Sequence, residues 1–240
     1  MKSTLKNSSV KIRPANERGH ANHGWLDSYH TFSFADYHDE NHMGFRTLRV
    51  INEDRVDPGK GFGSHPHRDM EIFSYVVEGA LTHQDSMGNK FTIKPGDVQK
   101  ITAGTGIVHS EFNGSQKEKV HFLQIWILPA RRGLKPSYQE YSFALSDKGI
   151  PVSLIGSPQG GKNVIQFNQD VYVYKGALKA GESYRYDLKP GRGVWLQMVK
   201  GEVNLNDQKL SSGDGAAIEN LQEISITAQK DAEFLLIDMA

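Results

Sequence analysis

The hydrophobic residues of this chain gather in short runs, without the long stretches of period 3.6 that mark amphipathic helices. The runs are rich in Val, Ile, Phe, Tyr and Trp, and turn residues separate them. We expect strands at 45–51, 72–77, 90–93, 98–101, 120–128, 171–178, 194–199, 202–205, 223–227 and 234–237. Many short strands at close spacing predict an all-β sandwich or barrel.

One arrangement of strands and turns occurs twice. A strand that ends in Gly at 75–79 precedes a Gly-Asp turn at 95–97, and the same order returns at 197–201 and 212–214. Two similar β-domains in tandem explain the repetition. The polar segment 129–137 contains Pro and Gly and is expected to link them. The predicted domains are therefore 1–130 and 131–240.

Composition and charge exclude several classes of protein. The chain has 28 basic and 28 acidic residues and a formal net charge of zero, so we expect no direct binding to nucleic acid. It has no cysteine, which excludes disulfide scaffolds, Cys-type zinc sites and thiol nucleophiles. No stretch reaches the ~18 apolar residues of a membrane span, and the first residues lack the apolar core of a signal peptide. We expect a cytoplasmic protein without membrane contact.

The histidines are distributed unevenly. All ten lie in the first 121 residues, which a random distribution would give about once in a thousand sequences. Any imidazole chemistry therefore belongs to the first domain. These residues are His20, His23, His30, His38, His42, His65, His67, His83, His109 and His121.

Two short motifs carry the candidate chemistry. In an extended strand, His65-Pro66-His67 directs both imidazoles to one face, and His109-Ser110-Glu111 does the same with an imidazole and a carboxylate. A single such pair is more often a surface or core feature, but two motifs, each preceded by Gly, favour a ligand set. If the two strands face each other in a small barrel, these four side chains suit a divalent first-row metal.

The residues around these motifs resemble the cupins and, more narrowly, the pirin family. The block from His65 to Gly79 resembles the first cupin motif, and 102–111 resembles the pirin version of the second. Residues 15–34 look like the bacterial pirins described as quercetin 2,3-dioxygenases. The resemblance covers most of 12–130. It implies a bicupin, two tandem jelly-roll-type β-barrels with one metal in the N-terminal barrel.

The resemblance also bears on the choice of the carboxylate ligand. Glu71 shares parity with His65 and His67, and the corresponding glutamate binds the metal in many cupins, whereas pirins use the glutamate of the second motif. The implied ligands are His65, His67, His109 and Glu111. The implied metal is Fe(II), with Mn, Co, Ni, Cu and Zn as alternatives. Aligning the two repeats places four other residues at these ligand positions in the second half: Asp187, Lys189, Ile226 and Ala228. The second barrel should therefore lack the metal.

The activity implied by the resemblance is a metal-dependent dioxygenase that opens a flavonol ring with O2 and releases CO. Glu111 would be both a ligand and the general base that takes the proton of the substrate hydroxyl. Apolar side chains near the motifs are expected to line the pocket: Phe45, Phe62, Ile72, Phe73, Leu123 and Ile125. Besides the flavonol and O2, a protein partner is possible, and we expect a monomer.

Two alternatives stay open. Pirins are also described as non-enzymatic, iron-binding, redox-sensitive regulators of other proteins. Other cupins are sugar isomerases or epimerases, which need cationic and polar pockets, and the apolar strands beside the motifs speak against that role. Among the other histidines, we interpret His20, His23 and His30 as local hydrogen-bonding residues that could cover the mouth of the barrel. His38, His42 and His83 are expected in solvated loops, and His121 receives no role.

Overall fold

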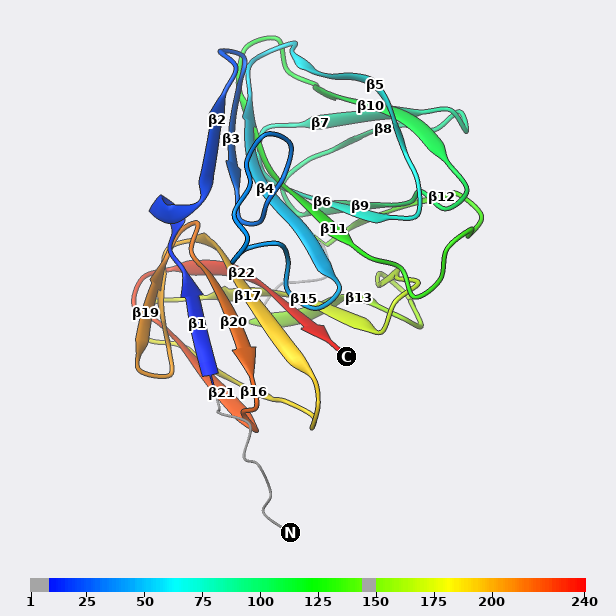
Figure 1. Cartoon of the computed structure of the whole chain (residues 1–240). Coiled ribbons are helices and arrows are strands. Elements are labelled where there is room, and N and C mark those ends of the chain that lie inside the picture. The colour runs from blue at the N-terminus through cyan, green and yellow to red at the C-terminus, as the bar shows by residue number, and fades with distance from the viewer. Residues whose placement is uncertain (1–8, 144–149) are drawn as a thin grey trace. The chain divides into compact units, whose positions relative to one another are not determined.

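The computed structural model describes residues 9–143 and 150–240 (Figure 1). Its regular structure is almost entirely β, with one short 3-10 helix, η1 (Ala15–Glu17), in this described part. Within the same ranges, no helix is long and apolar enough to cross a membrane. The all-β class predicted from the hydrophobic pattern is confirmed.

The chain divides into two compact units. One holds Arg18–Lys148 and Ser157–Asp170 and is called the histidine unit below, and the other holds Met1–Glu17, Gly149–Gly156 and Val171–Ala240 and is called the second unit. This division differs from a single boundary after residue 130. The first strand of the chain pairs inside the second unit, and the polar segment 129–137 connects two strands of the histidine unit.

The histidine unit consists of two antiparallel sheets. Their strands are β2 (Gly19–Asn22), β3 (Leu26–His30), β4 (Leu48–Val56), β5 (Gly61–His67), β6 (Glu71–Glu78), β7 (Leu81–Asp85), β8 (Lys90–Ile93), β9 (Asp97–Thr102), β10 (Ile107–Asn113), β11 (Val120–Ile127) and β12 (Ser137–Ser142). The residues of this unit also include the short strand β14 (Ile165–Gln166), which belongs to neither of these two sheets. The larger sheet has the order β12-β9-β6-β11-β4-β3-β2, and the smaller sheet has the order β5-β10-β7-β8. The strand expected from Phe45 begins at Leu48 because residues 45–48 form a tight turn closed by a bridge.

The second unit repeats this plan. Its strands are β1 (Ser9–Arg13), β13 (Val152–Ser157), β15 (Val171–Leu178), β16 (Ser183–Asp187), β17 (Gly193–Lys200), β18 (Glu202–Leu205), β19 (Gln208–Ser211), β20 (Gly215–Glu219), β21 (Glu223–Ala228) and β22 (Ala232–Met239). The order β20-β17-β22-β15 corresponds to β9-β6-β11-β4, and β16-β21-β18-β19 corresponds to β5-β10-β7-β8. The internal repeat in the sequence is therefore a repeat of topology.

Glycine closes the same turn in both units. Gly79 follows β6 with φ of 79°, and Gly201 follows β17 with φ of 78°. A Cβ atom would lie 2.6 Å from the carbonyl oxygen of Lys119 at the first position and 2.1 Å from that of Asp231 at the second. Both positions require glycine for its positive φ and because the backbone at the start of a neighbouring strand, β11 or β22, approaches closely.

The strand register corrects the predicted alignment of the repeats. His65 lies opposite His109, and in the second unit Tyr184 lies opposite Ile226. Asp187 lies opposite Glu223 and not opposite Ile226, so Asp187 and Ile226 cannot both stand at the positions of the opposed pair His65 and His109. The predicted alignment is made at the Gly79 and Gly201 turns and carried toward the N-terminus residue by residue. It fails because the connection from β16 to β17 spans 188–192, whereas the one from β5 to β6 spans only 68–70. The second unit still has no imidazole at these positions.

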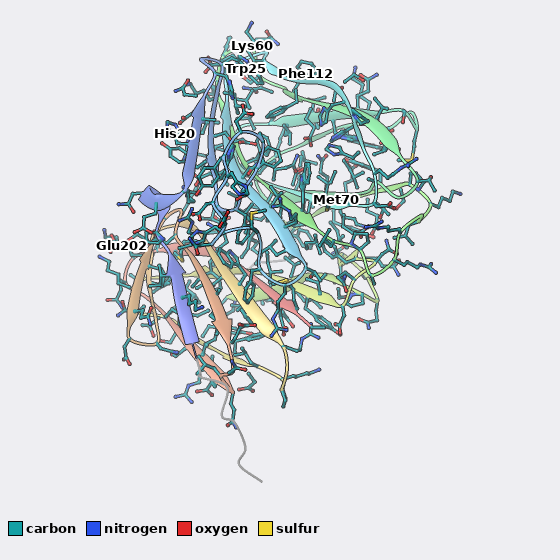
Figure 2. The ribbon with its side chains drawn as sticks, viewed as in Figure 1. His20, Trp25, Lys60, Met70, Phe112 and Glu202 are labelled. Carbon is teal, nitrogen blue, oxygen red and sulfur yellow. The ribbon has the colours of Figure 1, made fainter. Side chains whose placement is uncertain are left out.

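Figure 2 shows the side chains that the strands of both units carry. The two units fill their interiors differently. A continuous apolar cluster that includes Ile226 and Ala228 fills the second unit. In the described residues of the histidine unit, β6 contributes Val76 and Ile72 to two smaller apolar clusters. Between these two residues, on the same face of β6, lies Ser74, because side chains alternate along a strand. A polar layer thus separates the two apolar clusters of the histidine unit.

Candidate metal centre

Three imidazoles meet where β5 pairs with β10. The ring centroids of His65 and His109 are 4.4 Å apart, and His67 lies 4.8 Å from each of them. One ligand nitrogen from each of the three rings lies within 4.8 Å of the others. The antiparallel register produces this cluster because it sets His65 opposite His109 and His67 opposite Ile107. The convergence expected from the two motifs is present for the three histidines.

Hydrogen bonds fix which nitrogen His65 and His109 can offer. The Nδ1–H group of His65 donates to the carbonyl oxygen of Gly63 at 2.7 Å, which leaves its Nε2 as the ligand atom. Nδ1 of His109 lies 3.3 Å from Nδ1 of His83, whose Nε2 donates to Asp85 at 3.0 Å. This chain leaves Nε2 of His109 buried, with no hydrogen-bond partner in the described chain.

Burial keeps the rings of His67 and His109 neutral. It lowers the pKa of His109 to about 2, with the neighbouring His65, His67 and His83 adding to the effect. It also lowers the pKa of His67 to about 4, with a smaller contribution from His65. Neutral imidazoles with available lone pairs are the form that binds a metal. Because an unpaired buried nitrogen costs free energy, Nε2 of His109 fits a metal-ligand position.

His83 contradicts its predicted place in a solvated loop. It lies on β7, is fully buried, and faces the same interior as Leu81 and Asp85. The polar neighbours of His83 suggested a loop, but alternate residues of β7 are buried. His83, His109 and Glu111 form a second group whose ligand atoms lie within 4.8 Å of one another. Glu111 is therefore adjacent to the cluster through His109.

Amide groups hold the carboxylate of Glu111. Gln124 Nε2 donates to Oε2 at 2.6 Å, Gln99 Nε2 donates to Oε1 at 2.8 Å, and the hydroxyl of Ser74 lies 3.4 Å from Oε1. Burial raises the pKa of Glu111 to about 7, against the lowering effect of these hydrogen bonds. A carboxyl group with a pKa near neutrality can accept and release a proton at physiological pH.

The residues that hold Glu111 belong to a polar row across the larger sheet. Register pairs join Gln99 to Ser74, Ser74 to Gln124, Gln124 to Asn52 and Asn52 to His30. The row therefore crosses β9, β6, β11, β4 and β3 and consists of Gln99, Ser74, Gln124, Asn52 and His30. Sequence reasoning missed most of this row. The available signal was a single polar residue inside an apolar strand, as at Ser74 and Gln124.

Glu71, the alternative carboxylate ligand, is engaged elsewhere in the same unit. It forms a fully buried ion pair with Lys100 at 2.5 Å and accepts a hydrogen bond from the backbone N–H of Asn168 at 3.0 Å. Its neighbour Ile72 points to the interior with Ser74, so Glu71 lies on the opposite face of β6. The carboxylate of Glu71 belongs to neither of the candidate ligand groups found in the described chain.

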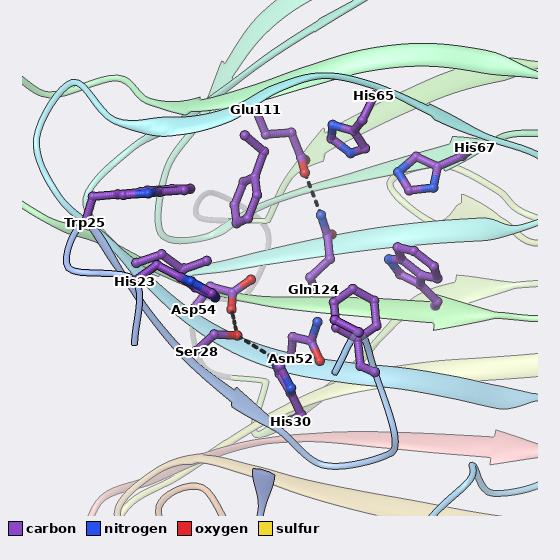
Figure 3. A pocket seen from close by; sticks show the side chains of 15 residues that line it. His23, Trp25, Ser28, His30, Asn52, Asp54, His65, His67, Glu111 and Gln124 are labelled. Atoms are coloured by element: carbon purple, nitrogen blue, oxygen red, sulfur yellow. Dashed lines mark hydrogen bonds between the residues drawn. The ribbon is translucent and has the colours of Figure 1, made fainter. Parts of the chain in front are cut away.

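A cavity of about 390 Å³ adjoins the histidine cluster (Figure 3). It is lined by His23, Trp25, Leu26, Ser28, His30, Phe34, Ala35, Asn52, Asp54, Phe62, His65, His67, Glu111, Gln124 and Trp126. Of the six apolar residues expected to line it, only Phe62 does so in the described structure. Leu123 and Ile125 point to the other face of β11 because Gln124 and Trp126 take the inner one. Phe73 packs on Phe167, Ile72 lies in an apolar cluster, and Phe45 closes a turn.

The N-terminal histidines separate into two kinds. His23 and His30 line the cavity. This position is compatible with the prediction that these histidines could cover the mouth of the barrel. His20 is exposed, lies 2.6 Å from Asp27 and stacks on Tyr29, so it is a local hydrogen-bonding residue. His121 bonds to Glu53 at 2.9 Å on the other side of the sheet from Gln124.

Two cupin units of one topology, with a metal-type histidine cluster in one of them, define a bicupin. Family models agree: residues 11–127 match the pirin model, and 154–239 match the quercetinase C-terminal cupin domain. The chain is 50% identical over 231 residues to quercetin 2,3-dioxygenase of Escherichia coli K12, covering 96% of this chain and 98% of the relative. It is 42% identical over 232 residues to a pirin-like protein of Caulobacter vibrioides, covering 96% and 100%.

A solved structure shows the same relationship. Bacterial pirin YhhW of Escherichia coli, in complex with nickel(II), superimposes with a TM-score of 0.92 at 49% identity, covering 96% of this chain and 99% of that one. The chain belongs to the pirin family. The expected kinship with its bacterial quercetin 2,3-dioxygenase branch is confirmed.

Proposed function

We propose that this pirin is a metal-dependent dioxygenase that opens a flavonol ring with O2 and releases CO. The observation that carries the proposal is the three-histidine cluster beside a buried glutamate at the wall of an aromatic-lined cavity. A volume of about 390 Å³ lies in the ~300–1,000 Å³ range of small-molecule sites. The 50% sequence identity to the Escherichia coli quercetin 2,3-dioxygenase supports a flavonol as the class of substrate.

His65, His67 and His109 would hold one divalent transition metal, with Glu111 as the fourth ligand. Fe(II) is our choice of metal, and the nickel(II) complex of YhhW supports a divalent ion without deciding its identity. When bound, the metal supplies a Lewis acid and a redox centre for dioxygen chemistry. Each carboxylate oxygen of Glu111 keeps a lone pair beyond its amide hydrogen bond, so orientation by Gln124 and Gln99 is compatible with ligation.

The protein groups account for binding and proton transfer. Trp25 and Phe62 meet edge to face at 5.5 Å, as do Phe34 and Trp126, and these rings suit a flat aromatic substrate. Glu111 accepts the proton of the hydroxyl beside the ring ketone, since its pKa of about 7 is suited to this transfer. Overall, both atoms of O2 enter the flavonol and one ring carbon leaves as CO, which balances the reaction.

The test is aerobic incubation of the metal-loaded protein with quercetin. We expect oxygen uptake, loss of the flavonol absorption band and CO in equal amounts. The variant Glu111→Gln should keep its fold and lose most of this turnover, because an amide cannot accept the proton. Absence of turnover with every first-row divalent metal would refute the proposed function.

A further inference from the structure

Two of the five residues in the polar row, Asn52 and His30, have no role in holding Glu111. Asn52 and His30 are 4% and 5% exposed, and both line the cavity. Oδ1 of Asn52 and Nδ1 of His30 are buried and have no hydrogen-bond partner among residues 9–143 and 150–240. Buried polar atoms are almost always paired because an unpaired one costs free energy. Two unpaired atoms on residues that are cross-strand partners at a cavity wall therefore point to a ligand.

The hydrogen-bond network determines what these two atoms can bind. The hydroxyl of Ser28 donates to Oδ1 of Asp54 at 2.5 Å, so its oxygen accepts from Nε2 of His30 at 2.9 Å. Burial lowers the pKa of His30, so the ring is neutral and its Nδ1 carries a lone pair. The side-chain oxygen of Asn52 is also an acceptor. The ligand group that fits here is a hydrogen-bond donor.

The two acceptors, Asn52 and His30, are separate from the histidine cluster. Ser28 and His30 lie on β3, and Asn52 and Asp54 lie on β4, whereas His65 and His67 come from β5 of the other sheet. Figure 3 shows these two groups on different sides of the pocket, with Gln124 between them. A flat ligand held at the cluster would extend past Gln124 along the polar row.

We propose that Asn52 and His30 bind a phenolic hydroxyl of the substrate that is remote from the metal ligands, and so select polyhydroxylated flavonols. This inference rests on the proposed function for the identity of the substrate. A phenolic hydroxyl is a good donor and lies in the plane of its ring, so a flat ligand can reach both acceptors from the cavity. A substrate without it would leave both acceptors unpaired, and such sites discriminate strongly against the analogue that lacks the group.

The test compares two probes in the absence of oxygen. Quercetin has hydroxyls on both outer rings, and 3-hydroxyflavone has only the hydroxyl beside the ketone. Quenching of tryptophan fluorescence in the metal-loaded full chain gives a Kd for each, since Trp25 and Trp126 line the cavity. We expect quercetin to bind about 10-fold or more tightly than 3-hydroxyflavone. Equal affinities in the wild-type protein would overturn the inference.

Two pocket variants test whether Asn52 and His30 cause the preference for quercetin over 3-hydroxyflavone. Asn52→Leu has nearly the same shape and should reduce the ratio of the two Kd values to about 2-fold or less, and His30→Phe should also reduce it. The matched control His20→Ala changes an exposed histidine outside the cavity and should preserve the ratio. An unchanged ratio in both pocket variants would overturn the inference, and His30→Phe still decides it if Asn52→Leu does not fold.

Turnover measurements keep the two proposals distinguishable. If flavonols bind with the expected ratio but are never oxidised, the hydroxyl site stands and the proposed function fails. If 3-hydroxyflavone and quercetin bind equally and both are oxidised, the proposed function stands and the hydroxyl site fails.

Discussion

Replacing Glu71 should cost stability and leave the metal in place. The Glu71→Gln variant removes the charge that pairs with Lys100 in the described part of the chain, and both side chains are completely buried. Breaking one side of a buried pair costs about 3–5 kcal/mol because the remaining charge is uncompensated. Burial already lowers the pKa of Lys100, and Glu71 opposes that effect, so its loss further disfavours the charged lysine.

Urea unfolding followed by circular dichroism measures the effect. With a slope of about 1–3 kcal/mol per molar urea, the midpoint should fall by about 1 M or more. Replacing both partners by Met should recover most of the loss, since apolar substitution of a buried pair is often neutral. Elemental analysis of the folded variant should show the wild-type metal content. Loss of metal without loss of stability would refute the reasoning and identify Glu71 as a ligand.

Three further predictions concern other parts of the chain. His109→Ala should lose the bound metal in elemental analysis while its circular dichroism spectrum is retained, and the loop control His42→Ala should keep the metal. Burial alone would raise the pKa of Glu53, but His121 and Arg18 outweigh it and lower the pKa to about 2. The charged form of Glu53 therefore stabilises the fold fully above about pH 4.5. Up to about 3 kcal/mol of the free energy of unfolding is lost as the pH falls to 2. When unfolding is measured at pH 5 and at pH 3, the difference between the two values should be smaller in Glu53→Gln than in the wild-type protein. Gly79→Ala should reduce the free energy of unfolding by about 2 kcal/mol or more, and Gly88→Ala by about 1 kcal/mol. Both glycines have positive φ, but only at Gly79 does a backbone atom lie within 3 Å of the added Cβ. Equal losses in the two glycine variants would contradict the packing argument.

The sequence predicts the features that depend on local pattern. Alternating apolar runs predicted strands, and the repeated Gly turns predicted two units of one topology, as Gly79 and Gly201 show. The histidine pair on β5 and His109 on β10 could be placed together because both motifs lie on strands that face one interior. The placement of these histidines on one face needed only the two-residue period of a strand.

Features that depend on long-range register were not predictable in the same way. The polar row joins five strands, and no local pattern says that Asn52 pairs with Gln124 and His30. Asp187 and Ile226 were aligned with the opposed pair His65 and His109 but do not lie opposite each other, because a connection of different length shifts the count. His83 was missed because its polar neighbours concealed a strand. A polar residue inside an apolar run, such as Ser74, is the sequence signal most useful for finding such a layer, since its burial requires a partner.

The central claim is that His65, His67 and His109 hold a divalent metal beside Glu111. Anomalous diffraction from crystals of the iron-loaded protein, recorded at the iron absorption edge, tests it most directly. We expect one strong peak per chain within bonding distance of the three imidazoles, and none in the second unit. A peak at Glu71, or at any site without these histidines, would contradict it.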